Sequence, residues 1–475
     1  MRRVSNSMMP WFVHLGVLWA PVSLTKADDR PPNVVVIMAD DLGWRDLHCY
    51  GNDEIDTPYL DQFATEGMLF TDAYAASPVC SPTRAAMMTG LAPARLRITN
   101  HAPGHPDGFA PDGATVREAE WVRNLSLSYV TIAERLKAQG YASAHIGKWH
   151  LSHVERGKDS AAKERTLRPE HQGFDVNIGG TRRGGPPSYF SPYKNDALPD
   201  GEDGEYLPER MADEAIHFVE SRKDQPFFLS WWPFSVHYPM EAREHVIEKY
   251  RARKKIKDPA YAAMIEGMDA SIGRFLKALD DLGLRENTLV IFKSDNGGYN
   301  GDNRPLRGMK GMIFEGGIRI PWMVRWPGVV TPGTTCSTPV ISTDVYPTIM
   351  DAIGGQGDAG SEMASPAIDG KSLVPLLRQA GDWDRDALYF HYPNYAFHKK
   401  NRLASAVRVG DFKLIKRYDD GSLELYNLKN DIGEQENLVE SDPERVGEMS
   451  QMLENWLDET GASLPTPVET ASESN

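Results

Sequence analysis

Cysteines and long apolar segments are scarce in this sequence. Three cysteines, Cys49, Cys80 and Cys336, occur among 475 residues, which is too few for a disulfide framework. Beyond the N-terminal region, no segment approaches the run of about 18 apolar residues that a membrane helix needs. These two deficits exclude a disulfide-stabilised miniprotein and a protein with several membrane spans. The length suits two domains of unequal size.

Basic residues are also in deficit. The chain has 52 lysines and arginines against 67 aspartates and glutamates, which is a net charge of -15. Because an acidic surface repels nucleic-acid phosphates and anionic lipids, we expect no nucleic acid and no stable membrane association among its partners. The sequence also lacks an internal repeat and a glycine-rich nucleotide-binding motif. An anionic substrate would therefore need a local cluster of basic side chains.

Residues 1–27 predict a signal peptide. Arg2 and Arg3 precede a mostly apolar stretch over 8–24, and the region contains no acidic residue. Prolines and a histidine interrupt the stretch, which favours a cleaved signal peptide over an uncleaved anchor. We therefore expect a periplasmic or secreted protein. We further predict a catalytic domain over 28–380, a C-terminal subdomain of short antiparallel strands and one helix over 381–463, and a disordered tail over 464–475.

Two apolar runs end in oxygen-bearing side chains. The run over 33–38 leads to Asp40 and Asp41, and the run over 288–292 leads to Asp295 and Asn296. Such runs are typical of strands that are buried on both faces of a parallel sheet. Ligands bind at the carboxyl edge of these sheets. Three carboxylates and one amide oxygen suit a hard divalent cation, Ca²⁺ or Mg²⁺, far better than zinc.

The motif C-x-P-x-R occupies residues 80–84. It follows a strand-like run over 68–76 and precedes a helix-like run over 85–90. With Ser81 as N-cap and Pro82 as the first helical residue, Cys80 would lie just ahead of a helix whose free N–H groups attract anions. We interpret Cys80 as the nucleophile of an ester hydrolase. The alternative is a small buried cysteine with no chemical role.

Basic side chains and histidines follow other predicted elements. A strand over 141–146 leads to Lys148 and His150, which point to the same side if the chain stays extended. A strand over 226–232 leads to His237, and glycines flank Lys310. Each residue alone is more often a solvated or structural side chain, so their grouping around an anion is a hypothesis.

Together these motifs resemble the type I, formylglycine-dependent sulfatases, and in particular the arylsulfatase A-like enzymes of the alkaline phosphatase superfamily. The resemblance covers about residues 31–460 and includes the recurring stretches Met87–Gly90, Asp369–Leu373 and Leu425–Leu428. It implies an α/β fold with a large mixed, mostly parallel sheet flanked by helices, as in alkaline phosphatase. It also implies a smaller C-terminal α+β subdomain built on an antiparallel sheet.

The resemblance implies a role for each candidate residue. A formylglycine-generating enzyme would oxidise Cys80 to formylglycine (3-oxoalanine) before folding, and a hydroxyl of the hydrated aldehyde would attack sulfur. His237, with Lys310, would protonate the departing alcohol, and His150 would then deprotonate the second hydroxyl so that sulfate is eliminated. The implied metal ligands are Asp40, Asp41, Asp295, Asn296 and the modified Cys80, and the implied sulfate-binding residues are Arg84, Lys148, His150, His237 and Lys310.

The expected substrate is a sulfated carbohydrate, with an aryl sulfate as the small alternative. Predicted export favours this class, and so do the candidate substrate-binding residues Arg182, Arg183 and Tyr189, because they lie in a long loop over 173–207. A phosphodiesterase or phosphonate monoester hydrolase of the same superfamily is the alternative function. A non-catalytic glycan-binding relative is disfavoured by the complete residue set. If Cys80 is modified, Cys49 and Cys336 could pair, but the sequence carries no geometry to decide this.

Overall fold

An eight-stranded sheet forms the centre of the fold. The computed structural model describes residues 1, 30–354 and 368–468, so the predicted signal peptide, apart from Met1, lies outside the described residues. The strand order is β10-β2-β9-β8-β1-β7-β5-β6. Neighbours run parallel, except that β9 is antiparallel to β2 and β8, which confirms a mixed, mostly parallel sheet. The strands are β1 (Asn33–Ala39), β2 (Met68–Phe70), β5 (Ala142–Gly147), β6 (Val176–Ile178), β7 (Phe227–Trp232), β8 (Thr288–Ser294), β9 (Trp322–Arg325) and β10 (Thr334–Cys336).

The neighbouring strands β1 and β8 lie in the middle of this sheet and consist of buried residues throughout. Alternate residues of β1 face opposite sides, so Val35 joins one hydrophobic cluster and Val34 joins another. In the parallel register of the two strands, Ala39 is opposite Ser294. The chain segments that follow β1 and β8 therefore leave the sheet at the same edge.

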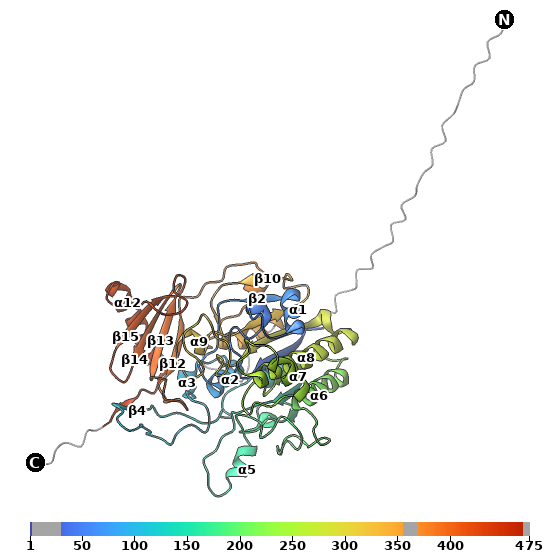
Figure 1. Ribbon diagram of the computed structural model, residues 1–475, viewed down its shortest axis with the longest axis horizontal. Coiled ribbons are helices and arrows are strands. Elements are labelled where there is room, and N and C mark those ends of the chain that lie inside the picture. The colour runs from blue at the N-terminus through green and yellow to red at the C-terminus, as the bar shows by residue number, and fades with distance from the viewer. Residues whose placement is uncertain (2–29, 355–367, 469–475) are drawn as a thin grey trace, which may run out of the picture. The chain divides into compact units, whose positions relative to one another are not determined.

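Helices cover both faces of the sheet. One cluster includes α1 (Pro58–Glu66), α6 (Leu207–Ser221), α7 (Glu244–Arg251) and α8 (Pro259–Asp281), and the other includes α2 (Cys80–Thr89), α4 (Ile132–Ala138), α10 (Val345–Ala352) and α11 (Val374–Leu377). Figure 1 shows α6, α7 and α8 beside one another. Helix α4 starts with a capping box, since Thr131 Oγ1 accepts the Glu134 N–H and Glu134 Oε2 accepts the Thr131 N–H.

A four-stranded antiparallel sheet follows in the C-terminal part of the chain. It is formed by β12 (Leu388–Tyr392), β13 (Ala404–Val409), β14 (Phe412–Arg417) and β15 (Leu423–Asn427), and α12 (Pro443–Thr460) packs on one face. The other face packs on residues near Cys80, including Tyr74 and Val79. Lys413 is buried and its Nζ donates at 2.9 Å to both Glu315 and Glu434. Contacts group Pro31–Asn475 into one compact unit, and the boundary near residue 380 stays a prediction.

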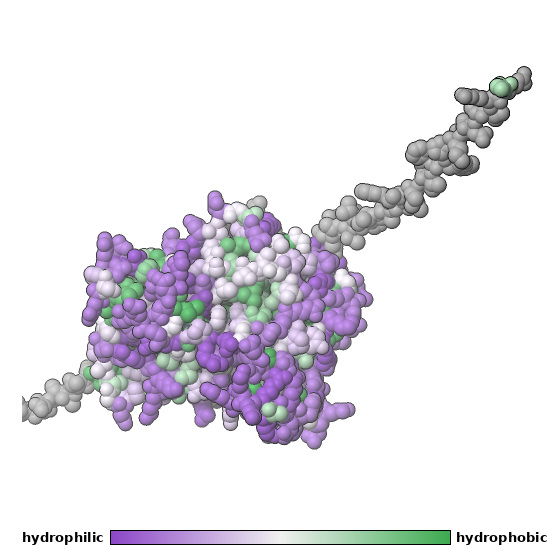
Figure 2. Space-filling model, turned by 45° about the horizontal axis from the view of Figure 1, so that its top comes forward, coloured by the Kyte–Doolittle hydropathy of each residue, from purple (hydrophilic) through white to green (hydrophobic). Residues whose placement is uncertain are grey.

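Shorter elements complete the fold. They are β3 (Ala73–Tyr74), β4 (Val116–Arg117), β11 (Val340–Ile341) and β16 (Thr466–Pro467), the short helices α3 (Pro93–Leu96), α5 (Ser160–Arg165) and α9 (Glu315–Ile318), and the 3-10 turns His48–Tyr50, Pro169–His171, Arg285–Asn287 and Ser342–Asp344. None of the helices in the described part of the chain is long and apolar enough to cross a membrane. On the face shown in Figure 2, hydrophilic residues predominate and apolar residues form small separate groups.

Three local predictions are corrected by the structure. The run over 68–76 is divided into β2 and β3, and β3 pairs with β11 in a separate small sheet. Helix α2 begins at Cys80 with Val79 as N-cap, so Ser81 and Pro82 lie inside the first turn. The predicted tail is ordered as far as Val468 because β16 pairs with β4, and residues 469–475 lie outside the described part. All three cysteines are free, so Cys49 and Cys336 are not paired.

Candidate active site

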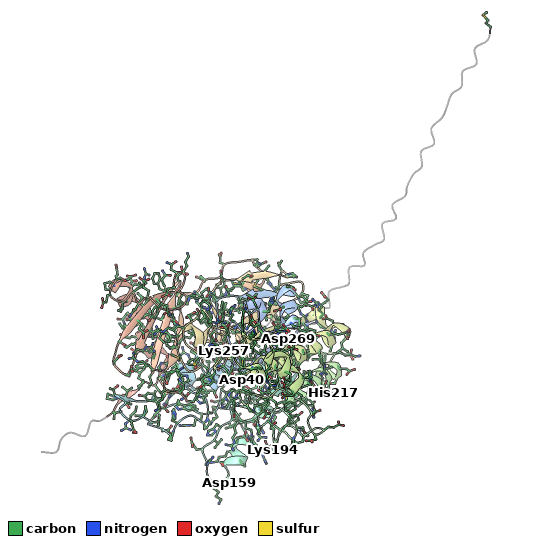
Figure 3. The ribbon with its side chains drawn as sticks, in the orientation of Figure 1. Asp40, Asp159, Lys194, His217, Lys257 and Asp269 are labelled. Atoms are coloured by element: carbon green, nitrogen blue, oxygen red, sulfur yellow. The ribbon has the colours of Figure 1, made fainter. Side chains whose placement is uncertain are left out.

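Asp40, Asp41, Asp295 and Asn296 meet where β1 and β8 end. The backbone of Asp41 is left-handed, with φ 62°, so the chain turns sharply at this residue. Its N–H donates to Asp295 Oδ1 at 3.1 Å, and Asn296 Nδ2 donates to Asp41 Oδ1 at 2.8 Å. All four side chains are buried, and Figure 3 shows Asp40 in the interior of the fold. The structure thus brings together the four predicted metal ligands.

Cys80 lies against this acidic group. Its Sγ is 3.8 Å from Asp40 Oδ1 and 4.0 Å from Asp41 Oδ1, and ligand atoms of the three residues lie within 4.8 Å of one another. Burial raises the pKa of the Cys80 thiol to about 12. An unmodified Cys80 is therefore a neutral thiol near pH 7, and a neutral thiol is a poor nucleophile.

Three basic side chains neutralise the three carboxylates. Lys148 Nζ lies 2.8 and 2.7 Å from the two Asp40 oxygens, and Lys310 Nζ lies 2.7 Å from Asp41 Oδ2. Arg84 Nη2 lies 2.7 Å from Asp295 Oδ2. Burial raises the pKa of Asp40 to about 7, although Lys148 opposes this shift. For Asp41, burial also disfavours the charge, but Lys310, His237 and Lys148 outweigh it and lower the pKa.

The donor set fits a hard divalent cation. Asn296 Oδ1 is a buried oxygen that has no hydrogen-bond partner among the described residues, although the Nδ2 of the same amide is bonded to Asp41. A buried polar atom of this kind normally has a partner. Three carboxylates and this free amide oxygen are the hard ligands that Ca²⁺ and Mg²⁺ prefer.

Two histidines line the cavity above Cys80. His237 Nδ1 contacts the Tyr238 carbonyl at 2.8 Å, and its Nε2 lies 3.8 Å from Asp41 Oδ2. His150 Nε2 contacts the Ala102 carbonyl, and its buried Nδ1 has no partner in the described part of the chain. In each ring the nitrogen at the carbonyl carries the proton, and the other is free to accept one. Burial lowers the pKa of His237 to about 3 and that of His150 well below its ordinary value.

The argument that placed Lys148 and His150 on one side of an extended chain is wrong. Gly147 has φ 103° and His150 has φ 60°, so the backbone leaves the strand conformation at both residues. Lys148 nevertheless reaches Asp40, and His150 lines the Cys80 cavity. Both are buried, and the structure places them close to the predicted centre by a different path of the backbone.

The loop that contains Arg182 and Arg183 packs against the two histidine rings at Gly184 and Gly185. A Cβ on Gly184 would lie 2.9 Å from His150 Cε1, and one on Gly185 would lie 2.7 Å from His237 Nδ1. Only glycine allows this approach without a shift. Both glycines line the Cys80 cavity, and Arg182 and Arg183 are exposed beside them.

Tyr189 is not placed where a substrate could reach it. Its side chain is 0% exposed, and its hydroxyl donates to the carbonyls of Phe234 and His237 at 2.6 and 2.9 Å. The prediction that Tyr189 binds substrate is therefore corrected. It supports the loop that carries His237.

Comparisons with known proteins agree with this geometry. The Sulfatase family model matches residues 32–355. The chain belongs to the sulfatase family. A second model, described as N-sulphoglucosamine sulphohydrolase, C-terminal, matches residues 309–462. This sulfatase is 32% identical to a sulfatase of Formosa agariphila, over 94% of this chain and 93% of the relative. It is 33% identical to human arylsulfatase A, over 81% of this chain and 74% of the relative.

A solved structure supports the same assignment. The crystal structure of Ps i-CgsB matches with a TM-score of 0.75 and 27% identity, over 90% of this chain and 93% of that chain. The fold is that of the sulfatases in the alkaline phosphatase superfamily. The chain is therefore a sulfuric ester hydrolase.

Several lining residues of the sulfatase cavity were missed in the sequence. The cavity has a volume of 440 Å³. His101, Tyr238, Tyr299 and Phe397 also line it. Of these residues, Tyr238 is 71% exposed, and Tyr299 and Phe397 are each 44% exposed. Tyr238 follows His237 directly and could have been found from that position. No pattern in the sequence connects Phe397 to the site, because it lies between β12 and β13.

Proposed function

We propose that this sulfatase removes sulfate groups from carbohydrate, with Cys80 in its formylglycine form and with Ca²⁺ or Mg²⁺. The observation that carries the proposal is the contact of Cys80 Sγ with Asp40 and Asp41 at 3.8 and 4.0 Å. This contact supports the proposal, because the nucleophile and the metal ligands that the sequence predicts would have to lie next to each other. It lies in a cavity that His150, His237 and Lys310 also line.

Conversion of Cys80 explains how a buried position with an unreactive thiol can act. Burial raises the pKa of this thiol to about 12, so the encoded residue supplies almost no thiolate near pH 7. A hydrated aldehyde supplies a hydroxyl that forms the new bond to sulfur while the bond from sulfur to the alcohol oxygen breaks. Loss of the second hydroxyl's proton re-forms the carbonyl and releases sulfate. The conversion requires a formylglycine-generating enzyme before folding.

The side chains around Cys80 would bind the cation and supply positive charge to the sulfate group. Asp40, Asp41, Asp295 and Asn296 would hold the cation, which supplies positive charge for the sulfate and for the attacking oxygen. Arg84, Lys148 and Lys310 add three positive charges in a water-poor site, where they act strongly on the charge of the transferring group.

Each of the two histidines has one ring nitrogen that is not hydrogen-bonded to a backbone carbonyl, Nε2 in His237 and Nδ1 in His150. His237 keeps its Nδ1 proton on the Tyr238 carbonyl, and burial lowers its pKa, so Nε2 is unprotonated near pH 7 and would relay to the leaving alcohol a proton from Lys310, which lies nearby on Asp41. In His150 the free atom is Nδ1. This atom would take the proton of the second hydroxyl.

Sulfated carbohydrate is the substrate class that we propose. A human N-acetylgalactosamine-6-sulfatase is 33% identical over 76% of this chain and 68% of the relative. Ps i-CgsB, 27% identical, has been solved in complex with k-i-k-neocarrahexaose. The exposed rings at the cavity offer flat apolar faces to sugar rings, and Arg182 and Arg183 offer positive charge nearby. We also propose a periplasmic or secreted location, from the predicted signal peptide.

The alternative, a phosphodiesterase or phosphonate monoester hydrolase, has weaker support. A phosphonate monoester hydrolase of Agrobacterium radiobacter shares the fold with a TM-score of 0.63, but it is 19% identical. The sulfatase relatives are closer in sequence. Rates on matched aryl sulfate, phosphate and phosphonate esters would separate the two functions.

Mass spectrometry of the Cys80 peptide tests the proposal directly. Active preparations are expected to carry the aldehyde, in proportion to their specific activity, when the protein is produced with a formylglycine-generating enzyme. The Cys80→Ala protein is expected to fold and to show background turnover, because no diol can form. Full activity with an unmodified thiol would refute the mechanism.

A further inference from the structure

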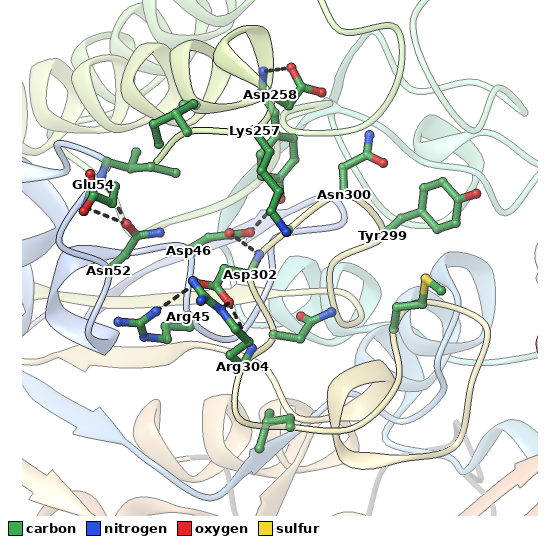
Figure 4. A pocket seen from close by; sticks show the side chains of 18 of the residues that line it. Arg45, Asp46, Asn52, Glu54, Lys257, Asp258, Tyr299, Asn300, Asp302 and Arg304 are labelled. Atoms are coloured by element: carbon green, nitrogen blue, oxygen red, sulfur yellow. Dashed lines mark hydrogen bonds and ion pairs between the residues drawn. The ribbon is translucent and has the colours of Figure 1, made fainter. Parts of the chain in front are cut away.

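A second cavity adjoins the Cys80 cavity. Its volume is 920 Å³, against 440 Å³ for the first, and both lie within the range of about 300–1,000 Å³ that is typical of ligand sites. Tyr261, Tyr299 and Asn300 line both cavities. The two spaces are therefore neighbours with a common border, and Figure 4 shows Tyr299 and Asn300 at the right side of the second one.

The walls of the second cavity continue the segments that carry the metal ligands. Arg45 and Asp46 come shortly after Asp41, and residues 299–304 come shortly after Asn296. The Arg45 N–H donates to the Asp302 carbonyl at 2.8 Å, and the Asp302 N–H donates to Asp46 Oδ1 at 2.7 Å. These bonds join the two segments, so the second cavity has a fixed position relative to the catalytic centre.

Most acidic groups of the second cavity already have partners within the protein. The carboxylates with a partner are Asp46 (bonded to Gly43 and Tyr261), Asp302 (paired with Arg45 and Arg304), Glu54 (paired with Lys255) and Asp258 (bonded to the Tyr261 N–H). Asp53 is exposed. The acidic groups other than Asp53 therefore have part of their charge neutralised or hydrogen-bonded before any ligand arrives.

Lys257 and Lys400 have no such partner among the residues that the structure describes. Both line the second cavity and both are exposed. Within the described ranges, no acidic side chain forms an ion pair with either lysine. Figure 4 shows Lys257 pointing into the cavity. Thirteen of its 23 lining residues are charged or carry an amide, which suits a ligand rich in hydroxyl groups far better than an apolar alcohol.

We propose that the second cavity binds the sugar residue adjacent to the one whose sulfate is removed. Lys257 and Lys400 bind an anionic group, sulfate or carboxylate, on that adjacent residue, and Tyr299 and Asn300 contact the chain where it crosses between the cavities. This inference rests on the proposed function. It makes the enzyme selective for an oligosaccharide with more than one anionic group over a monosaccharide sulfate.

Equilibrium binding to the Cys80→Ala protein tests the inference without turnover. The probes are sulfated monosaccharides and size-defined di- and tetrasaccharides from carrageenan and chondroitin sulfate, titrated by calorimetry. In at least one series, affinity is expected to rise about tenfold or more, which is about 1.4 kcal/mol, from the monosaccharide to the tetrasaccharide, because the longer ligand gains charged hydrogen bonds to the two lysines. Substitution of both lysines, Lys257→Gln and Lys400→Gln, is expected to remove most of this gain.

A matched control separates the effect of the two cavity lysines from the effect of losing positive charge elsewhere on the surface. Lys254→Gln removes an exposed lysine that precedes Lys257 and does not line the cavity, and it is expected to keep the gain. The inference is overturned if affinity does not rise with chain length in any series. It is also overturned if the rise persists in the double variant and that variant has a normal melting temperature. Turnover of an aryl sulfate by the converted wild-type enzyme is measured separately. Its absence would refute the proposed function and leave the binding result interpretable.

Discussion

Arg84 and Asp295 form a fully buried ion pair in which both Nε and Nη2 of the guanidinium contact Asp295 Oδ2, at 3.0 and 2.7 Å. Arg84 Nη1 donates to the Lys148 carbonyl at 3.0 Å, and the guanidinium carbon lies 5.1 Å from the Trp232 ring centroid. The arginine therefore links the predicted metal ligand, the backbone beside Lys148 and the core. Its orientation is set by several partners at once.

Arg84→Lys is expected to lower kcat by about 100-fold or more, because one ammonium group cannot replace the planar donor set beside the transferring sulfate. The melting temperature is also expected to fall, since the variant leaves part of a buried charge network without partners. Kinetics on an aryl sulfate and thermal unfolding measure the two effects. Unchanged kcat in the folded variant would contradict the assigned role.

Removal of divalent cations is expected to abolish activity, and Ca²⁺ or Mg²⁺ is expected to restore it. Binding to the folded state alone raises stability by about 2.7 kcal/mol when the ion is at 100 times its Kd. Asn296→Ala removes the free amide oxygen and is expected to shift the Ca²⁺ dependence of the melting temperature to higher concentrations. Asn303→Ala is the control, since Asn303 Oδ1 already accepts the Gly298 N–H. Restoration by Zn²⁺ alone would count against a site of oxygen ligands.

Arg182→Ala combined with Arg183→Ala is expected to lower kcat/KM on a sulfated oligosaccharide about tenfold, or about 1.4 kcal/mol, and to affect a small aryl sulfate much less. The reason is that both side chains are exposed beside the cavity, while the charges around Cys80 are buried. The control removes the same charge at Arg156 and Lys158, which are also exposed. Equal losses on both substrates would show that the loop serves the chemical step.

Tyr189→Phe is expected to misplace His237 rather than to remove a substrate contact. The variant leaves the Phe234 and His237 carbonyls without a buried donor, at a cost of about 1–3 kcal/mol. A fall in kcat with KM little changed would be the signature. Tyr193→Phe, which loses hydroxyl bonds to Glu205 instead, is expected to lower stability without this fall.

Asp269 is expected to make stability depend on pH. It is buried and accepts the N–H groups of Tyr59 and Leu60 at the start of α1, and burial, together with Asp61 and Glu266, raises its pKa to about 7. Because the folded state holds this proton more tightly than the unfolded chain, the contribution of Asp269 to stability is full below about pH 4 and is lost as the pH rises through 7.

The comparison with Asp269→Asn measures this effect. The difference in the free energy of unfolding, wild type minus variant, is expected to fall by at most about 4 kcal/mol from pH 4 to pH 8, and the difference in melting temperature is expected to fall with it. Titrating groups that do not interact with Asp269 change both proteins equally, so the difference reports on Asp269 and its neighbours Asp61 and Glu266. A difference that does not vary with pH would contradict the raised pKa.

The metal ligands and the central sheet could be predicted because they depend on local rules. Buried apolar runs form inner parallel strands, and the residues after two such strands must meet at one edge. This reasoning places Asp40 and Asp295 together without any knowledge of the rest of the chain.

The predictions that were wrong or missing concern residues whose surroundings depend on contacts between distant parts of the chain. Ser81 was predicted as N-cap, but its hydroxyl donates to the His150 carbonyl and accepts the Ala102 N–H. These long-range partners outweigh the local preference. Tyr189 lies in a polar loop, and only the folded path of that loop shows that the ring is buried. Phe397 reaches the cavity from the connection between β12 and β13, which no local pattern indicates.

The connection between β12 and β13 has a consequence for how substrate preference can diverge. His398 Nε2 contacts the Lys310 carbonyl at 2.8 Å, and Phe397 in the same connection lines the cavity. This short segment thus touches both the main chain of Lys310 and the Cys80 cavity. Replacement of Phe397 is expected to change the shape of this cavity and to leave the charged residues around Cys80 in place. Exchange of this surface loop, which is far from Cys80 in the sequence, is therefore expected to change the substrate preference of the enzyme.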